Sequence, residues 1–164
     1  MKSTKSKKVV FLDRDGVINK KADKHCYITK EKDFVFNDGI FNVCLHLQNN
    51  GFEFIVITNQ RGIARGFYTE TDLEKIHNIM KRGFLEKGIN LLDIFYCPHE
   101  EGVCNCRKPK PGMLEMSFEK YCFDKGGAIL ISDTMEDVSM GESFGIGKNI
   151  YVTSDKPEEA LSFV

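Results

Sequence analysis

The 164-residue sequence predicts an α/β fold built on a doubly wound, Rossmann-like parallel sheet. Three observations favour this class. Short apolar runs alternate with amphipathic segments along the whole chain. The runs lack polar alternation, which is typical of strands covered on both faces. The first run, from Val9 to Leu12, stops at two acids, Asp13 and Asp15. Ligands of open sheets bind at the carboxyl ends of the strands, so we expect function at that edge.

The predicted strands cover residues 9–12, 52–58, 93–96, 128–132 and 149–152. We expect five helices between and after them. Asp38 is expected to cap the first helix, and either Thr69 or Thr71 the second. The third begins near Pro111, because proline is accepted in a first helical turn. The fourth is short, and Asp155 is expected to cap the last.

Apolar side chains repeat at helical spacing in the first three helices. The positions expected to face inward are Ile40, Phe41, Cys44, Leu45 and Leu47 in the first helix, Leu73, Ile76, Met80 and Phe84 in the second, and Leu114, Phe118 and Tyr121 in the third. No long insertion interrupts the alternation of elements. We therefore expect a single domain over residues 1–164, without a cap domain.

Composition and charge narrow the class of function. The formal net charge of −1 favours neither a nucleic-acid-binding nor a membrane-surface protein. No apolar run approaches the ~20 residues of a membrane span. The apolar run after the basic start is too short for a signal peptide. We therefore expect a cytoplasmic protein, and the sequence carries no signal for its oligomeric state. The basic start consists of Lys2, Lys5, Lys7 and Lys8.

Asp13 and Asp15 suit a metal site. In an extended backbone, alternate positions point to the same side. Two negative charges at such a short distance need a cation between them or a shared proton. Hard carboxylate oxygens suit Mg²⁺, with water and a substrate phosphate as its other ligands. The alternative, for an isolated Asp-X-Asp, is a strand end followed by a solvated turn.

Other strand ends add the groups that phosphoryl transfer needs. Thr58 ends the second predicted strand and Asn59 follows it, Asp133 follows the fourth strand, and Lys108 lies in a loop before a helix. With Asp13, they provide a carboxylate nucleophile, a metal ligand, a hydroxyl and a fixed ammonium. Each residue alone has an ordinary alternative, such as a helix cap or a solvated lysine. Their joint placement at one sheet edge favours catalysis.

The loop over residues 97–106 carries a second candidate site. Three thiolates and one imidazole match a tetrahedral zinc site, and four ligands close the shell, so this zinc should be structural. The alternative is a loop with reduced thiols. Zinc would anchor the segment that presents Arg107 and Lys108. Cys26, Cys44 and Cys122 are expected to be buried or bystander thiols, because disulfides are unlikely without an export signal. The proposed zinc ligands are Cys97, His99, Cys104 and Cys106.

Four segments of the chain resemble the four motifs of the haloacid dehalogenase superfamily. They are FLDRDGVIN at 11–19, ITNQ at 57–60, CRKP at 106–109 and SDTMED at 132–137. More narrowly, they are similar to the histidinol-phosphate and D-glycero-D-manno-heptose 1,7-bisphosphate phosphatases. The segments GIARG at 62–66 and PKPGM at 109–113 are most similar to the heptose bisphosphate branch. The resemblance covers nearly the whole chain.

This resemblance implies a role for each matching residue. Asp13 would be the nucleophile that forms an aspartyl-phosphate, and Asp15 the acid that protonates the leaving alcohol and then activates water. Mg²⁺ would be held by Asp13, Asp133 and the main-chain carbonyl of Asp15. Thr58 and Lys108 would hold the phosphoryl oxygens. The branch also implies zinc in the 97–106 loop. The residues implied to face the substrate are Asn59, Gln60, Arg61 and Arg107, with His25 and Tyr27 in a substrate-facing loop.

Two departures from the family pattern concern the substrate. The family commonly has Gly-Asp-Lys at its fourth motif, whereas this chain has Ser132-Asp133-Thr134 and lacks that cation. The loop between His99 and Cys104 is also shorter than in many relatives. We expect Mg²⁺-dependent hydrolysis of a small phosphate monoester, with the heptose 1,7-bisphosphate as the first candidate. The alternative is another sugar, polyol or amino-alcohol monophosphate, including histidinol phosphate.

Two other classes of protein share part of this pattern. A receiver domain also accepts phosphate on an aspartate, but it places that residue at the end of the third strand, where this chain has Cys97. An inactive, zinc-stabilised binding module is disfavoured because every core catalytic residue type is present. Neither class would show steady turnover of phosphate esters with Mg²⁺.

Overall fold

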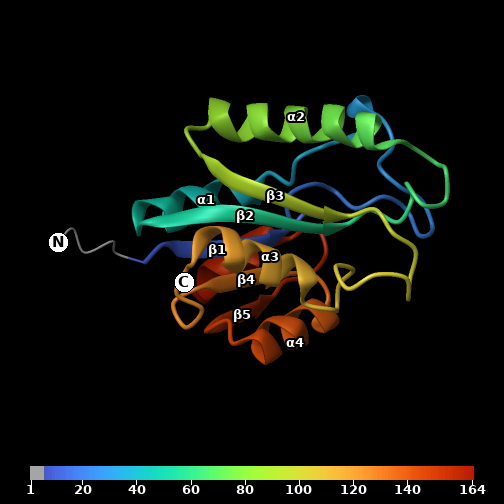
Figure 1. Ribbon diagram of the computed structural model, residues 1–164. Helices are drawn as coiled ribbons and strands as arrows, with labels where there is room; N and C mark the ends of the chain where they lie inside the picture. The colour runs from blue at the N-terminus through green and yellow to red at the C-terminus, as the bar shows by residue number, and fades with distance from the viewer. Residues whose placement is uncertain (1–5) are drawn as a thin grey trace.

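The computed structural model describes residues 6–164, so Lys2 and Lys5 of the basic start lie outside the described residues. Its centre is a five-stranded parallel sheet with the strand order β3-β2-β1-β4-β5 (Figure 1). This sheet confirms the predicted α/β class. The strands are β1 (Lys8–Asp13), β2 (Phe52–Asn59), β3 (Leu91–Cys97), β4 (Ile129–Ser132) and β5 (Lys148–Tyr151).

Helices cover both faces of this sheet. One core cluster joins α1 (Gly39–Asn49) and α2 (Glu70–Glu86) to Val10 and Leu12 of β1. The other joins α3 (Gly112–Tyr121) and α4 (Met135–Phe144) to Val9 and Phe11. Alternate residues of β1 therefore point to opposite cores, as the unbroken apolar run predicted. In Figure 1, α2 lies at the top and α4 at the bottom. Among residues 6–164, no helix is long and apolar enough to cross a membrane.

The helix starts were predicted with mixed success. Thr69 caps α2 in a capping box: its hydroxyl accepts from the Asp72 backbone N–H at 3.1 Å, and the Asp72 carboxylate accepts from the Thr69 N–H at 2.9 Å. The prediction that Asp38 caps α1 is wrong. Its backbone is already helical, with φ −58° and ψ −37°, and its side chain makes no capping hydrogen bond.

Two further sequence predictions are wrong. Phe118 of α3 is 37% exposed, at the margin of the buried face formed by Met113, Leu114 and Ser117. The last segment is the 3₁₀ helix η2 (Pro157–Ser162), not an α-helix, and Asp155 does not cap it. Asp155 instead takes a left-handed conformation with φ 67°, and its carboxylate is used elsewhere.

The carboxyl edge of the sheet is the end at which loops gather, on the right of Figure 1. Residues 14–38, which include the 3₁₀ helix η1 (Glu31–Asp33), leave β1 at this edge. Residues 60–69 leave β2 at the same edge, because the two strands are parallel and in register from Lys8 opposite Phe52 to Asp13 opposite Ile57. The fold therefore brings together the strand ends that carry the predicted catalytic residues.

Candidate active site

Asp13 is the last residue of β1 and is buried at the carboxyl edge. Its Oδ1 accepts hydrogen bonds from Lys108 Nζ at 2.9 Å and from the Arg14 backbone N–H at 2.8 Å. Its Oδ2 accepts from Ser132 Oγ at 3.2 Å. Burial raises the pKa of Asp13 to about 7, although Lys108 acts in the opposite direction. A carboxylate in this position needs cations around it to stay ionised.

Asp15 lies two residues further on but has a different environment. Its carboxylate accepts from Arg14 NH2 at 2.9 Å, from Asn19 Nδ2 at 3.0 Å and from Gln60 Nε2 at 3.2 Å. Burial alone would raise the pKa of Asp15, but Arg14 and these hydrogen bonds outweigh it and hold the pKa below its ordinary value. Asp15 is therefore an ionised carboxylate with fixed orientation.

Lys108 links the strands β1 and β2 to helix α4. It is buried, and its Nζ donates to Asp13, to Asp137 at 2.6 Å and to the Ile57 carbonyl at 3.3 Å. Burial opposes the charge, but Asp13 and Asp137 raise the pKa of Lys108 above its ordinary value, so it stays an ammonium ion. Asn59 holds the Lys108 backbone with hydrogen bonds of 3.0 and 3.1 Å.

Asp133 follows β4, and its side chain is fully buried. Oδ2 accepts from Lys21 Nζ at 2.8 Å and from the Ser154 hydroxyl. Oδ1 has no hydrogen-bond partner among the described residues. Gly16, with φ +90°, packs so closely that a Cβ there would lie 2.3 Å from Asp133 Oδ2. A buried carboxylate oxygen with unused acceptor capacity fits a hard cation such as Mg²⁺.

Asp13, Asp15 and Lys108 line a pocket of about 510 Å³ at the carboxyl edge, whereas the predicted metal ligand Asp133 is not among its lining residues. Thr58 lies in its wall, and its hydroxyl accepts from Gln60 Nε2 at 2.8 Å. Arg107 also lines it, and its NH1 is buried without a partner among the described residues. The predicted site residues that line the pocket are Asp13, Asp15, His25, Tyr27, Thr58, Asn59, Gln60, Arg107 and Lys108.

Arg61 is the predicted substrate-facing residue that the structure does not bring to the pocket. Its NH1 lies 3.2 Å from Glu100 Oε1, and the neighbouring Arg65 Nε lies 2.9 Å from Glu100 Oε2. Both arginines therefore connect the 60–69 loop to the 97–106 loop. This pairing depends on two loop paths and could not be read from the sequence.

Several residues of the site were missed by the sequence analysis. Asp137 was noted one helical turn after Asp133 in the fourth motif, but it was given no role, and its contact with Lys108 was not predicted. Ser132 Oγ lies 3.2 Å from Asp13 Oδ2 and 2.9 Å from Asp137 Oδ2, and its single proton can be donated to either carboxylate. The buried Arg14 also contacts His77 of α2, with NH1 3.2 Å from Nε2. Burial first, and then Arg14, lower the pKa of His77 to about 3, so this imidazole is neutral.

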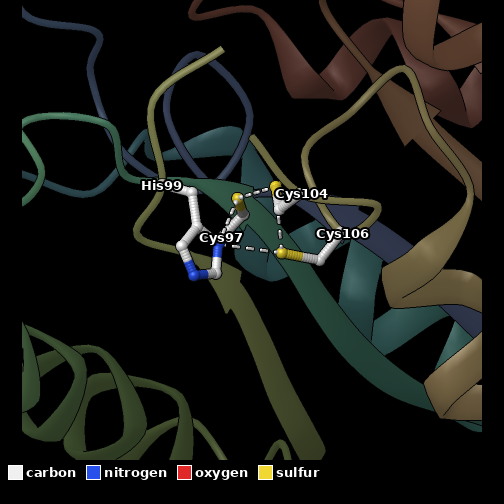
Figure 2. Close-up of side chains that lie close together, drawn as sticks. All are labelled: Cys97, His99, Cys104 and Cys106. Carbon is white, nitrogen blue, oxygen red and sulfur yellow. Dashed lines mark hydrogen bonds between the residues drawn. The ribbon is translucent and has the colours of Figure 1, made fainter. Parts of the chain in front are cut away.

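The cysteine cluster comprises Cys97, His99, Cys104 and Cys106. In the sequence it directly precedes Arg107 and Lys108, which line the pocket. Figure 2 shows the three sulfurs and His99 Nδ1 pointing toward one another. Neighbouring ligand atoms are 3.3 to 3.5 Å apart, and all four lie within 4.8 Å of one another. Ligands at tetrahedral zinc, with bonds of about 2.0–2.3 Å, are separated by roughly 3.5–3.8 Å. The four residues can therefore hold a metal ion of this kind.

Comparison with known proteins agrees with this geometry. The family described as polynucleotide kinase 3 phosphatase matches residues 8–143. The D-glycero-alpha-D-manno-heptose-1,7-bisphosphate 7-phosphatase of Campylobacter jejuni is 42% identical over 151 residues, which cover 92% of this chain and 86% of the relative. The corresponding beta-heptose enzyme of Vibrio cholerae is 39% identical over 160 residues, covering 93% and 84%.

A solved structure is also similar. It is a D,D-heptose 1,7-bisphosphate phosphatase from B. bronchiseptica complexed with magnesium and phosphate, with a TM-score of 0.82 and 28% identity, over 96% of this chain and 87% of that one. These findings confirm the family predicted from the four motifs and the prediction of a phosphatase. The chain belongs to the haloacid dehalogenase superfamily of phosphatases, in the family that contains the D-glycero-D-manno-heptose-1,7-bisphosphate 7-phosphatases.

Proposed function

We propose that the protein removes the 7-phosphate of D-glycero-D-manno-heptose 1,7-bisphosphate. The observation that carries this proposal is the convergence of Asp13, Asp15, Thr58 and Lys108 in one pocket, in a chain 39 to 42% identical to enzymes named for that reaction. The pocket is open at its rim to a loop with several polar side chains, which suits a small, hydroxylated substrate. Relatives are named for both the alpha and the beta anomer, so either anomer is a candidate.

Asp13 is the proposed nucleophile. Its carboxylate oxygen attacks phosphorus, the bond from phosphorus to the leaving oxygen breaks, and Asp15 gives a proton to that oxygen. Water then attacks the aspartyl-phosphate, Asp15 takes a proton from the water, and the Asp13–phosphorus bond breaks to release phosphate. Lys108 and Thr58 would stabilise charge on the phosphoryl oxygens.

The environment of Asp15 fits its two tasks in different ways. The pKa of Asp15 lies below its ordinary value in the free protein, so Asp15 is ready to accept a proton from water in the second step. A bound phosphate dianion would raise this pKa, because a nearby like charge disfavours the ionised carboxyl. Substrate binding would therefore supply the proton-bearing Asp15 that the first step needs.

Two metal ions complete the proposal. Asp13, Asp133 and the main-chain carbonyl of Asp15 would hold Mg²⁺, and the unpartnered, buried Asp133 Oδ1 supports this choice. Mg²⁺ in such a site neutralises charge on phosphoryl oxygens. The cysteine cluster would hold a structural zinc ion. The one-domain organisation, the cytoplasmic location and the lack of nucleic-acid partners stay predictions of the sequence.

A substrate panel tests the proposed function. We would measure kcat/KM with Mg²⁺ for both anomers of the heptose 1,7-bisphosphate, histidinol phosphate, and sugar, polyol and amino-alcohol monophosphates. A 3′-phosphorylated oligonucleotide belongs in the panel because of the matching family's description. One heptose anomer is expected to exceed every monophosphate by at least about tenfold, since a second phosphate adds a charge-assisted contact. A monophosphate or the oligonucleotide as the best substrate would contradict the proposal.

A further inference from the structure

Lys21 occupies an unusual place at the mouth of the pocket. Its Nζ lies 2.8 Å from Asp133 Oδ2, while its side chain is 46% exposed and that of Asp133 is fully buried. The base of the residue is fixed, because the Lys21 backbone N–H donates to Asp155 Oδ1 at 2.9 Å. Only the flexible end of the side chain is free to move. The loop after β1 thus presents the Lys21 ammonium group to the pocket, which Lys24 of the same loop also lines.

The two buried cations of the pocket are held more firmly than Lys21. Lys108 Nζ has three acceptors, Asp13, Asp137 and the Ile57 carbonyl, which use the three donors of an ammonium group. Arg14 is 1% exposed and is held by Asp15 and His77. Among the described residues, the sole hydrogen-bond acceptor of Lys21 Nζ is Asp133. Its other two donors are available to a ligand.

The end of β4 lacks a cation of its own. Thr134 lines the pocket with a neutral side chain, and its hydroxyl lies 3.3 Å from Ser132 Oγ. A phosphate dianion entering this pocket meets the carboxylates of Asp13 and Asp15, which repel it. A cation held at Asp133 Oδ1 would repel the Lys21 ammonium group, which lies 2.8 Å from Oδ2 of the same carboxylate. The ammonium group could then turn toward the incoming anion.

We propose that Lys21 is a substrate-binding residue that contacts the anionic oxygens of the phosphate group and replaces the cation missing at Thr134. The inference rests on the proposed phosphatase function. It concerns a residue in the loop after β1, outside the four motifs. The nearest alternative is that Lys21 only neutralises Asp133 when no metal ion is bound. In that case, Lys21 has no part in binding phosphate once Mg²⁺ is present.

Phosphate binding distinguishes these two roles without any turnover. We would titrate inorganic phosphate into the full-length protein at saturating Mg²⁺ by isothermal titration calorimetry. Lys21→Met is expected to raise Kd about tenfold or more, from the loss of one charge-assisted hydrogen bond. Lys21→Arg should stay within about threefold of the wild type. The matched control is Lys20→Met, because Lys20 is exposed and does not line the pocket; its Kd should not change.

A second-site variant makes the test sharper. Lys21→Met combined with Thr134→Lys returns an ammonium group to the pocket from another strand end, so it should recover part of the lost affinity. An unchanged Kd in Lys21→Met, or no phosphate binding by the wild type, would overturn the inference. If a compound other than the heptose bisphosphate is the best substrate but Lys21→Met still raises the Kd for phosphate, only the proposed substrate is contradicted. Thermal unfolding of each variant checks that the fold is kept.

Discussion

The catalytic pocket and the cysteine cluster meet at residues 106–108 but are held together in different ways. Contacts in the pocket join distant parts of the chain, such as Asp13 to Lys108 and Asp13 to Ser132. Each of its buried charges faces an opposite charge or a hydrogen-bond donor. The cluster, in contrast, comes from one ten-residue loop over residues 97–106. Its thiolates repel one another when ionised, so its cohesion depends on a bound metal ion.

This difference indicates which site depends on which. Lys108 is fixed by the two hydrogen bonds to Asn59 and by its buried carboxylate partners, all of which come from other parts of the sheet edge. Arg107, directly beside it, has no such partner on NH1 among the described residues. Loss of the metal ion should therefore disturb Arg107 and substrate affinity more than Lys108 and the chemical step.

The largest effect is expected in the pocket, from Asp13→Asn. The amide is not nucleophilic, so turnover should fall by on the order of 10³-fold or more. The matched control is Asp23→Asn, because Asp23 lines the same pocket but is exposed. Phosphate release from the best panel substrate is the measurement. Asp13→Asn with more than a tenth of wild-type kcat would exclude Asp13 as the nucleophile.

The second effect separates the cluster from the pocket. Cys104→Ser should lower the metal content from about one zinc per chain to near zero, and it should reduce the free energy of unfolding by several kcal/mol. The increase in KM should exceed the decrease in kcat, because Asn59 still holds Lys108. Cys122→Ser is the control, since Cys122 is exposed and outside the cluster. Equal zinc content in the two variants would show that the cluster is not the metal site.

The smallest effect concerns the pocket's support from α2. The pKa of His77 is about 3 in the fold against an ordinary 6.5. A neutral buried imidazole therefore stabilises the fold above pH 6.5, and this stability is lost as the pH falls toward 3. Between pH 7.5 and pH 5, the wild type should lose about 2 kcal/mol more than His77→Gln, measured by urea unfolding.

The control for His77 is the same substitution at an exposed histidine. His46→Gln, on the outer face of α1, should leave the pH dependence unchanged. Acid release of metal from the cluster acts on all three proteins alike, so the difference between variants reports on His77. Identical slopes for the wild type and His77→Gln would mean that folding does not lower the pKa of His77.

Features formed by residues close together in the sequence were predictable, whereas contacts between distant parts of the chain were not. The strands and their acidic ends were predictable, because an apolar run followed by Asp13 or Asp133 is a local pattern. The cysteine cluster was predictable for the same reason. Spacing could also have revealed His77, since it follows Leu73 by four residues and lies on the same buried face.

The rest depended on loop paths. Residues 14–38 have no periodic pattern, so nothing in the sequence indicated that Lys21 reaches Asp133 or that Asp155 holds the Lys21 backbone. The same holds for the pairing of Arg61 with Glu100. Phe118 fits a helical repeat with Leu114, but the inner face of α3 is centred on Met113, Leu114 and Ser117, which leaves Phe118 at its margin.

The strand order also bears on how the protein is made. β1, which carries the nucleophile, is the first strand in the chain, yet it lies between β2 and β4. Its second neighbour, β4 (Ile129–Ser132), follows β1 only after α1, β2, α2, β3 and α3. Until β4 has been synthesised, one backbone hydrogen-bonding edge of the apolar strand β1 has no strand partner, and exposed strand edges promote aggregation. The order that places the catalytic acid at the centre of the sheet therefore leaves one edge of its strand unpaired until β4 is made.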